Sequence, residues 1–185
     1  MKRNQVRIIG GKWRSRLIHF PNAANLRPTP DRIRETLFNW LAPYISGARC
    51  LDLFAGSGAL GFEALSRDAH FATLVESNPL VIQTLKDTQQ RLATEQCEII
   101  GQDVLTWLME PKTSFDVVFL DPPYQSNALP ICFSLLETHG WIAQHSLIYF
   151  ESHTPLNPSL LPITWVLLRE RKAGHVHYYL AKKMF

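Results

Sequence analysis

The chain has 185 residues and a formal net charge of +3, and this length is typical of one domain with a substantial hydrophobic core. Its three widely spaced cysteines form no C-x-x-C pair, so neither a disulfide nor a structural metal site is expected. No apolar run approaches the roughly 20 residues that cross a bilayer. We therefore expect a cytoplasmic, monomeric protein that binds no membrane and holds no metal.

Basic residues are concentrated at the start of the chain. The first 34 residues hold nine of the 19 Lys and Arg residues, against the single acid Asp31. This asymmetry favours a polyanionic partner, although a solvated charged face explains the composition equally well. In the same region, "VRIIGGKWRSRLIHF" has two β-rich segments around Gly10 and Gly11, which predicts a hairpin with a tight glycine turn. We assign residues 1–28 to this basic hairpin extension and residues 29–185 to the main domain.

A helix is predicted within "RPTPDRIRETLFNWLAPYI". Thr29 is a candidate N-cap, Pro30 suits the first helical position, and Asp31 lies near the positive end of the helix dipole. One apolar face is then expected, because apolar residues recur at helical spacing at Ile33, Leu37, Trp40 and Leu41.

From Arg49 onward, short apolar runs alternate with helical segments. The runs are "RCLDLF", "FATLVE", "CEIIG", "FDVVFL" and "WIAQHSLIYFE", and "PLVIQTLKDTQQRLA" is the longest helical segment between them. This alternation predicts right-handed βαβ units and a mostly parallel sheet with helices on both faces. "ITWVLLRERK" and "GHVHYYLAKK" follow with little room for a helix between them, so the sheet is expected to end in an antiparallel pair.

The loops after the strands are where chemistry is expected, because an open α/β sheet binds ligands outside the carboxyl ends of its strands. The first such loop, in "DLFAGSGALG", contains a G-x-G-x-x-G pattern from Gly56 to Gly61, where glycine lets the backbone approach a ligand closely. Glu76 lies 20 residues beyond Gly56, the spacing at which an acid can accept hydrogen bonds from ribose hydroxyls. Asp103 can accept a bond from an adenine amino group.

These features predict a cofactor that carries a nucleoside. NAD remains an alternative, because a lone G-x-G-x-x-G also describes a dinucleotide-binding fold. Against NAD, Asp52 would place a negative charge close to a pyrophosphate. S-adenosylmethionine has cationic amino and sulfonium groups and no phosphate, so it suits this acid better.

A second motif, "DPPY", follows the apolar run "FDVVFL". Its two prolines fix the backbone and remove two amide donors. The Asp121 carboxylate and a carbonyl of the Asp121–Pro122 segment can then accept the two hydrogens of an exocyclic amino group, while Tyr124 stacks on the base. Orientation and electrostatics would favour attack of that nitrogen on a sulfonium methyl group. With a reference pKa of about 3.9, Asp121 would accept a proton only once the methylated amine has become acidic.

Together these motifs resemble a known family. "DPPY" and "DLFAGSGALG" resemble the class I S-adenosylmethionine-dependent amino methyltransferases. With "RIIGGKWRSR" and "LRPTPDRIRETLFNWL", the chain resembles the bacterial 16S rRNA guanine-N2 methyltransferases of the RsmD type from Arg7 to about Glu151. The resemblance implies a Rossmann-like class I fold with a seven-stranded sheet whose last strand is antiparallel. It also implies methylation of the N2 amino group of a guanosine in 16S rRNA, within small-subunit ribosomal particles.

Three sets of site residues follow. The catalytic set is Asp121, Pro122 and Tyr124. The set expected to bind S-adenosylmethionine is Asp52, Phe54, Ala55, Gly56, Ser57, Gly58, Glu76, Asp103 and Val104. The set expected to bind RNA is Arg7, Lys12, Arg14 and Arg16. Two positions depart from the family pattern, with Ser15 where glycine is usual and Pro30 where a second threonine is usual.

The RNA set rests on the predicted hairpin. Lys12, Arg14 and Arg16 alternate along an expected strand, so they would project to one face and neutralise phosphates. Trp13 would either stack on an unpaired base or pack in the core. A DNA adenine-N6 or cytosine-N4 methyltransferase, which would share the "DPPY" chemistry, and a non-catalytic RNA-binding assembly factor remain alternative functions. The sequence does not divide Arg27, Arg32 and Arg34 between cofactor and RNA.

Overall fold

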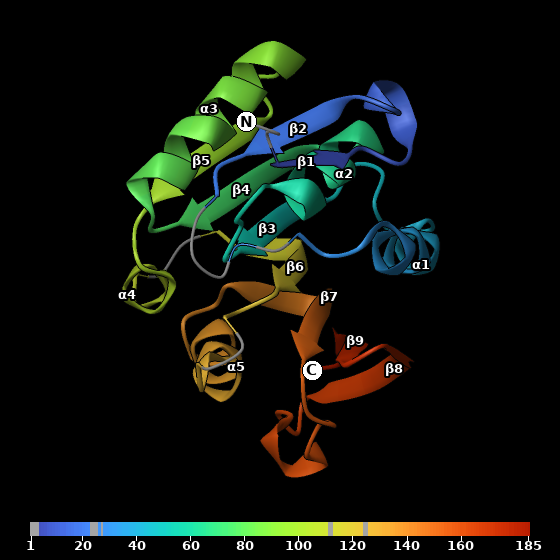
Figure 1. Cartoon of the computed structure of the whole chain (residues 1–185). Coiled ribbons are helices and arrows are strands. Elements are labelled where there is room, and N and C mark those ends of the chain that lie inside the picture. The colour runs from blue at the N-terminus through green and yellow to red at the C-terminus, as the bar shows by residue number, and fades with distance from the viewer. Residues whose placement is uncertain (1–3, 23–25, 27, 111–112, 124–125) are drawn as a thin grey trace.

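The computed structural model describes residues 4–22, 26, 28–110, 113–123 and 126–185. A small antiparallel sheet pairs β1 (Asn4–Arg7) with β2 (Leu17–Phe20), and a larger sheet follows it (Figure 1). The strands of the larger sheet are β3 (Arg49–Leu53), β4 (Phe71–Glu76), β5 (Cys97–Gly101), β6 (Phe115–Leu120), β7 (Ile142–Ser152), β8 (Trp165–Ala173) and β9 (Val176–Lys183). The helices are α1 (Asp31–Leu41), α2 (Ala59–Ser66), α3 (Pro79–Leu92), α4 (Val104–Leu108) and α5 (Ala128–Thr138), with short 3-10 helices η1 (Gly11–Trp13) and η2 (Pro158–Leu160).

The larger sheet has the predicted mixed topology. Its strand order is β5-β4-β3-β6-β7-β9-β8. Strands β3 to β7 run parallel to one another, whereas β9 runs antiparallel to both β7 and β8. The Rossmann-like fold class is therefore confirmed, with its antiparallel pair at one edge. The order changes direction between β3 and β6, which is the switch point where such sheets bind ligands.

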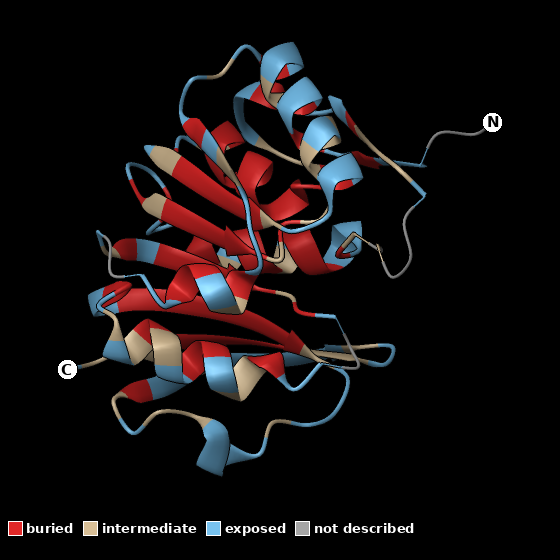
Figure 2. Cartoon of the chain, turned by 90° about the vertical axis from the view of Figure 1, so that its left-hand side faces the viewer, coloured by how far each residue is buried: buried red, intermediate tan, exposed pale blue. Residues whose placement is uncertain are grey.

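Two hydrophobic cores lie on the two faces of this sheet. One core joins the sheet to α1, α2, α3 and the N-terminal hairpin, and the other joins it to α4 and α5. Figure 2 shows the buried strands between helices whose outer surfaces are exposed. The middle strands are buried on both faces because helices cover both, which explains their nearly continuous apolar runs. Within the described residues, no helix has the length and apolar character needed to cross a membrane.

The hairpin forms, but the predicted turn is wrong. The strands pair from Asn4 with Phe20 to Arg7 with Leu17, so residues 8–16 form a wide connection that contains η1. Gly11 has a φ of +74°, and a Cβ atom there would lie 1.7 Å from the Ser66 carbonyl oxygen at the end of α2. The glycine therefore permits the connection to approach α2 closely. Ser15, where glycine was expected from the family resemblance, also has a left-handed φ of 71°.

The predicted start of α1 is also corrected. The N-cap is Pro30, and Thr29 makes no capping bond. Its side chain is buried, and its hydroxyl lies 2.9 Å from Glu151 near the end of β7 and 3.5 Å from Asp121 after β6. The local sequence favoured a cap, but acceptors brought close by the fold take the hydroxyl. The apolar face is confirmed, since Ile33, Leu37 and Leu41 are buried.

Candidate active site

A cavity of about 290 Å³ lies at the carboxyl ends of β3, β4, β5 and β6. Its volume is near the lower end of the range typical of small-molecule sites. Of the predicted cofactor residues, it is lined by Asp52, Phe54, Ala55, Gly56, Ser57, Glu76, Asp103 and Val104. Asp121, Pro122 and Pro123 form one wall, so the catalytic and cofactor motifs meet in one cavity. The lining residues that the sequence did not indicate are Leu26, Pro28, Thr29, Ala59, Leu60, Ser77, Asn78 and Val81.

The glycine loop between β3 and α2 needs its glycines for two reasons. Gly56 and Gly58 have φ angles of +51° and +75°, which L side chains rarely adopt. At Gly58, the N-cap of α2, a Cβ atom would lie 2.7 Å from both Leu85 and Phe62. Gly58 does not line the cavity itself. It shapes the cavity by letting the loop turn against α3.

Asp52 is a buried acid at the end of β3. Its Oδ2 atom accepts a bond from the Gly61 amide at 2.9 Å. Burial raises the pKa of Asp52 to about 8, with a further rise from the charge of Glu76, while the Gly61 bond lowers it. A cationic group beside Asp52 would stabilise the ionised carboxylate. The site therefore suits a ligand that carries positive charge beside Asp52.

Two more acids at strand ends are held by backbone amides. The Glu76 carboxylate accepts bonds from Gly56 at 3.0 Å, from Ser77 at 2.9 Å and from Asn78 at 2.8 Å. Asp103 is the N-cap of α4, where its Oδ1 atom accepts bonds from the amide and the hydroxyl of Thr106. Both carboxylates are thus fixed at the cavity wall as acceptors, the arrangement that ribose hydroxyls and an adenine amino group need.

Asp121 is half-buried and follows β6 directly. Burial raises its pKa well above the usual range, the charges of Glu151 and Asp52 add to the rise, and a hydrogen bond from Thr29 lowers it. The ordinary pKa expected for Asp121 from the sequence is therefore corrected upward. Pro122 is buried beside it. Tyr124 lies outside the described residues, and its stacking role stays a prediction.

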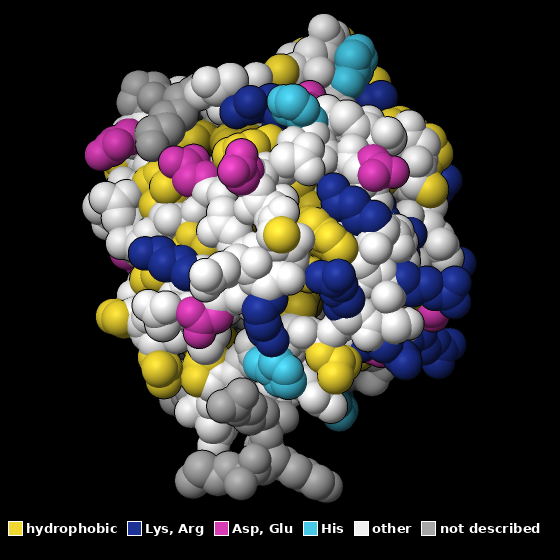
Figure 3. Space-filling view, turned by 90° about the horizontal axis from the view of Figure 1, so that it is seen from above, with side chains coloured by type: hydrophobic (Ala, Val, Ile, Leu, Met, Phe, Trp, Pro, Cys, Tyr) yellow, Lys and Arg dark blue, Asp and Glu magenta, His cyan; other side chains and the backbone are white. Residues whose placement is uncertain are grey.

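Of the predicted RNA residues, Lys12 and Arg16 lie away from the cavity, whereas Arg7 contacts Asp31, close to Thr29 in the cavity wall. All four are exposed, but only Arg7 belongs to a strand, so the predicted alternation of Lys12, Arg14 and Arg16 along a strand is wrong. Lys12 contacts Gln96 before β5, at 3.3 Å, and Arg16 contacts the Arg91 carbonyl near the end of α3, also at 3.3 Å. These contacts place the pair at the amino ends of the strands, whereas the cavity is at the carboxyl ends. Figure 3, which views the molecule from above Figure 1, shows Lys and Arg side chains on this face together with some Asp, Glu and His.

Trp13 belongs to the core rather than to that surface. Its side chain is buried, and its amide donates to the Ser66 hydroxyl at 2.9 Å. Of its two predicted roles, the core role is therefore confirmed. The bond to Ser66 helps to hold the hairpin connection against α2.

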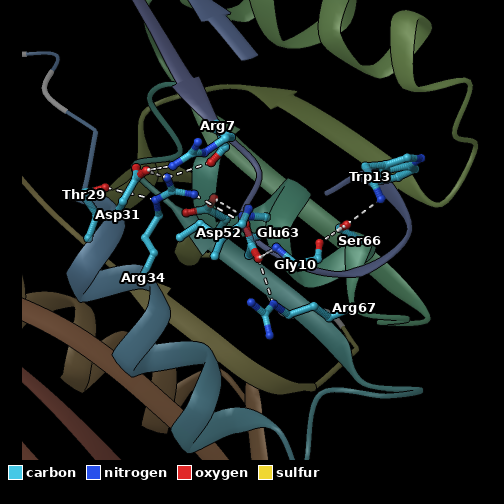
Figure 4. Close-up of polar contacts among 12 residues, drawn as sticks. Arg7, Gly10, Trp13, Thr29, Asp31, Arg34, Asp52, Glu63, Ser66 and Arg67 are labelled. Atoms are coloured by element: carbon cyan, nitrogen blue, oxygen red, sulfur yellow. Dashed lines mark hydrogen bonds and ion pairs between the residues drawn. The ribbon is translucent and has the colours of Figure 1, made fainter. Parts of the chain in front are cut away.

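Arg34 has a structural role. Its guanidinium is fully buried and donates to the Thr29 and Arg7 carbonyl oxygens, to Asp31 and to Glu63 (Figure 4). Glu63, also fully buried, accepts bonds from Arg67 and from the amides of Ile9 and Gly10. This network, called here the Arg34–Glu63 network, joins the hairpin, α1 and α2. Arg32 is exposed on α1, and Arg27 lies outside the described residues.

The fold and this cavity define a Rossmann-like methyltransferase. The family model described as "Conserved hypothetical protein 95" matches residues 6–182. The chain is 46% identical to ribosomal RNA small subunit methyltransferase D of Escherichia coli (strain K12), over 97% of this chain and 90% of that protein. It is 47% identical to the protein of the same name from Haemophilus influenzae, over 96% of this chain and 94% of that protein.

A solved structure agrees with these relatives. The yhhF protein of Escherichia coli superposes with a TM-score of 0.89 and 45% identity, over 98% of this chain and 99% of that chain. The chain belongs to the ribosomal RNA small subunit methyltransferase D family. The NAD alternative is set aside, because the relatives named here are methyltransferases.

Proposed function

We propose that the protein transfers a methyl group from S-adenosylmethionine to the N2 amino group of a guanosine in 16S rRNA, within small-subunit ribosomal particles. The observation that carries this proposal is the position of Asp121 and Pro122 in one wall of a cavity whose other walls hold Asp52, Glu76 and Asp103. Relatives matched over 90% and 94% of their own length are named as rRNA small subunit methyltransferases, which supports the substrate class.

The cavity fits the methyl donor by the chemistry of its acids. Glu76 would accept bonds from the ribose hydroxyls, Asp103 from the adenine amino group, and Asp52 would face a cationic part of the donor. When bound, the donor supplies an electrophilic methyl group on a sulfonium. These residues fix its orientation, and Asp121 and the Asp121–Pro122 backbone orient the guanine amino group toward it.

The RNA must present an unstacked base. A guanine amino group cannot reach this cavity while its base is stacked in a helix, so the target is extruded or lies in a loop. The basic surface formed by Lys12, Arg14 and Arg16 lies about one strand length from the cavity, roughly 17 Å for five residues. Structured rRNA is large enough to contact both, with phosphates at the basic surface and one base at Asp121.

Tritiated methyl transfer from S-adenosylmethionine tests this function directly. The substrates are small ribosomal subunits from cells that lack the enzyme, naked 16S rRNA and duplex DNA. We expect label in the subunits, recovered as N2-methylguanosine after nucleoside analysis. Label in duplex DNA alone would instead support the adenine-N6 or cytosine-N4 alternative, and label in another rRNA nucleoside would overturn the guanine-N2 assignment.

Replacing Glu76 by alanine is expected to weaken the binding of S-adenosylhomocysteine about 10- to 100-fold. Hydrogen bonds to a charged group contribute about 1.5–3 kcal/mol, and the variant also frees the Gly56 amide that shapes the loop. Isothermal titration calorimetry measures the change. Glu98→Ala, an exposed acid on the neighbouring strand β5, is the matched control and should bind normally. Equal affinities for the two variants would show that Glu76 does not contribute to binding the methyl donor.

The Arg14→Ala, Arg16→Ala double variant is expected to bind 16S rRNA particles about tenfold more weakly near physiological salt. Each lost phosphate contact should also lower the dependence of log K on log salt by about 1. Filter binding over a range of salt concentrations measures both effects. Arg169→Ala, exposed on β8 at the far edge of the sheet, controls for general loss of charge. An unchanged salt slope in the double variant would contradict a role in phosphate binding.

A further inference from the structure

Two acids lie side by side at the ends of neighbouring strands. In the parallel pairing of β6 and β7, Leu120 is opposite Phe150, so Asp121 and Glu151 occupy the next positions. Glu151 is 4% exposed and shares a strand face with Tyr149, two residues earlier. Glu151 is not among the predicted site residues, although it ends an apolar run as Glu76 and Asp121 do. That shared placement is the signal that could have identified it.

The Thr29 hydroxyl bridges the two acids. It lies 2.9 Å from Glu151 Oε1 and 3.5 Å from Asp121 Oδ2. The Tyr149 hydroxyl donates to the same Glu151 oxygen at 2.7 Å. Arg34 fixes Thr29 from the other side, because its Nε atom donates to the Thr29 carbonyl at 3.1 Å. The bridge is therefore held in place by the Arg34–Glu63 network.

The hydrogen bonds favour ionisation of Glu151 over ionisation of Asp121. Two hydroxyl groups donate to Glu151, which favours its ionised form, whereas Asp121 has only the longer contact to Thr29. Burial raises the pKa of both acids. Within the described residues, the other titratable groups that face the pair are Asp52 on β3, Tyr149 on β7 and Tyr178 on β9. In the antiparallel pairing of β7 and β9, Tyr178 is opposite Glu151. The pKa of Tyr149 is raised, so it remains a protonated donor.

We propose that Glu151 is a positioning residue for the methyl transfer, one that holds Asp121 through the Thr29 hydroxyl and makes it a stronger proton acceptor. The proposal rests on the proposed function. In the transfer, the bond from nitrogen to the methyl carbon forms as the carbon–sulfur bond breaks, and sulfur keeps the electron pair. The positively charged nitrogen then loses one proton to Asp121, and solvent water removes that proton from Asp121. A nearby negative charge on Glu151 favours the proton transfer to Asp121.

Direct titration of Asp121 tests this role without methyl transfer. Protein labelled with ¹³C at its aspartate carboxyl groups is titrated by NMR, and the Asp121 signal is assigned by its loss in Asp121→Asn. In Glu151→Gln, which keeps the size of the side chain but removes its charge, the pKa of Asp121 should fall and its titration should move to lower pH. In Thr29→Val the titration should move to higher pH, because the hydrogen bond that lowers the pKa is lost.

Steady-state kinetics then measure how the loss of the Glu151 charge changes the rate of methyl transfer. In Glu151→Gln, we expect the plateau kcat for rRNA methylation to fall about tenfold and the acid limb of the pH profile to move to lower pH, with S-adenosylhomocysteine affinity unchanged. Thr29→Ser should retain most activity, because it keeps the hydroxyl group. Glu170→Gln, an exposed position on β8, is the matched control.

The outcomes separate this proposal from the function on which it rests. If wild-type protein methylates rRNA but the Asp121 titration is the same in Glu151→Gln, Glu151 has only a structural role and the inference is wrong. If Glu151→Gln fails to fold, an unchanged Asp121 titration in Thr29→Val overturns it equally. Failure of the wild-type protein to transfer any methyl group would overturn the function itself.

Discussion

Replacing Asp121 by alanine is expected to lower the rate of rRNA methylation by about 10³-fold or more while leaving cofactor binding largely intact. The variant removes both an acceptor that orients the amino group and the base that takes its proton. Each effect is worth about 10²–10⁴ in comparable enzymes. Asp121 sits at one wall of the cavity, and the proposed donor contacts come mainly from Asp52, Glu76 and Asp103. Single-turnover methyl transfer and calorimetry with S-adenosylhomocysteine measure the two quantities separately.

Two further variants define what Asp121 contributes. Asp121→Asn keeps an acceptor oxygen for the amino group but cannot take the proton, so its rate should lie between those of the wild type and Asp121→Ala. Asp87→Ala, an exposed acid on α3, should retain full activity. Methylation by Asp121→Ala at close to the wild-type rate would contradict the mechanism, because no other described acid lies at the end of β6.

The mostly parallel sheet and the acids near its strand ends could be predicted from local sequence. Buried strands read as apolar runs, and a parallel sheet places every carboxyl end at one edge. Glu76 and Asp121 each close such a run, and Asp52 lies one residue before the end of β3, so their convergence in one cavity follows from the topology. The glycines of the β3–α2 loop were predictable for the same reason, since a strand that turns directly into a helix needs left-handed backbone.

The features that could not be predicted depend on partners distant in the sequence. Thr29 has the local pattern of an N-cap, but Glu151, its hydrogen-bond partner, is 122 residues away. Gly11 appeared to serve a hairpin turn, whereas its contact with Ser66 of α2 decides its role. Arg34 could not be distinguished from Arg32 by spacing or composition. Only the packed helix shows that one guanidinium faces the interior and the other faces solvent.

Replacing Arg34 by methionine is expected to lower the free energy of unfolding by about 1–3 kcal/mol, the usual cost of leaving buried hydrogen-bond acceptors without their donor. Methionine keeps most of the aliphatic volume, so the loss reports on the guanidinium contacts. Glu63 would keep Arg67 and two backbone amides, but the Thr29 and Arg7 carbonyl oxygens would each lose a donor. Urea unfolding followed by circular dichroism measures the change.

Arg32→Met is the matched control, because the same substitution is made two residues away on the exposed face of α1. Its stability should remain within about 0.5 kcal/mol of the wild type. Equal stabilities for the two variants would show that the Arg34–Glu63 network adds nothing beyond hydrophobic packing. A large loss in Arg34→Met alone would show that the hairpin, α1 and α2 are joined through one buried guanidinium. Because that guanidinium also fixes Thr29, methylation by folded Arg34→Met, assayed below its unfolding transition, should fall together with stability.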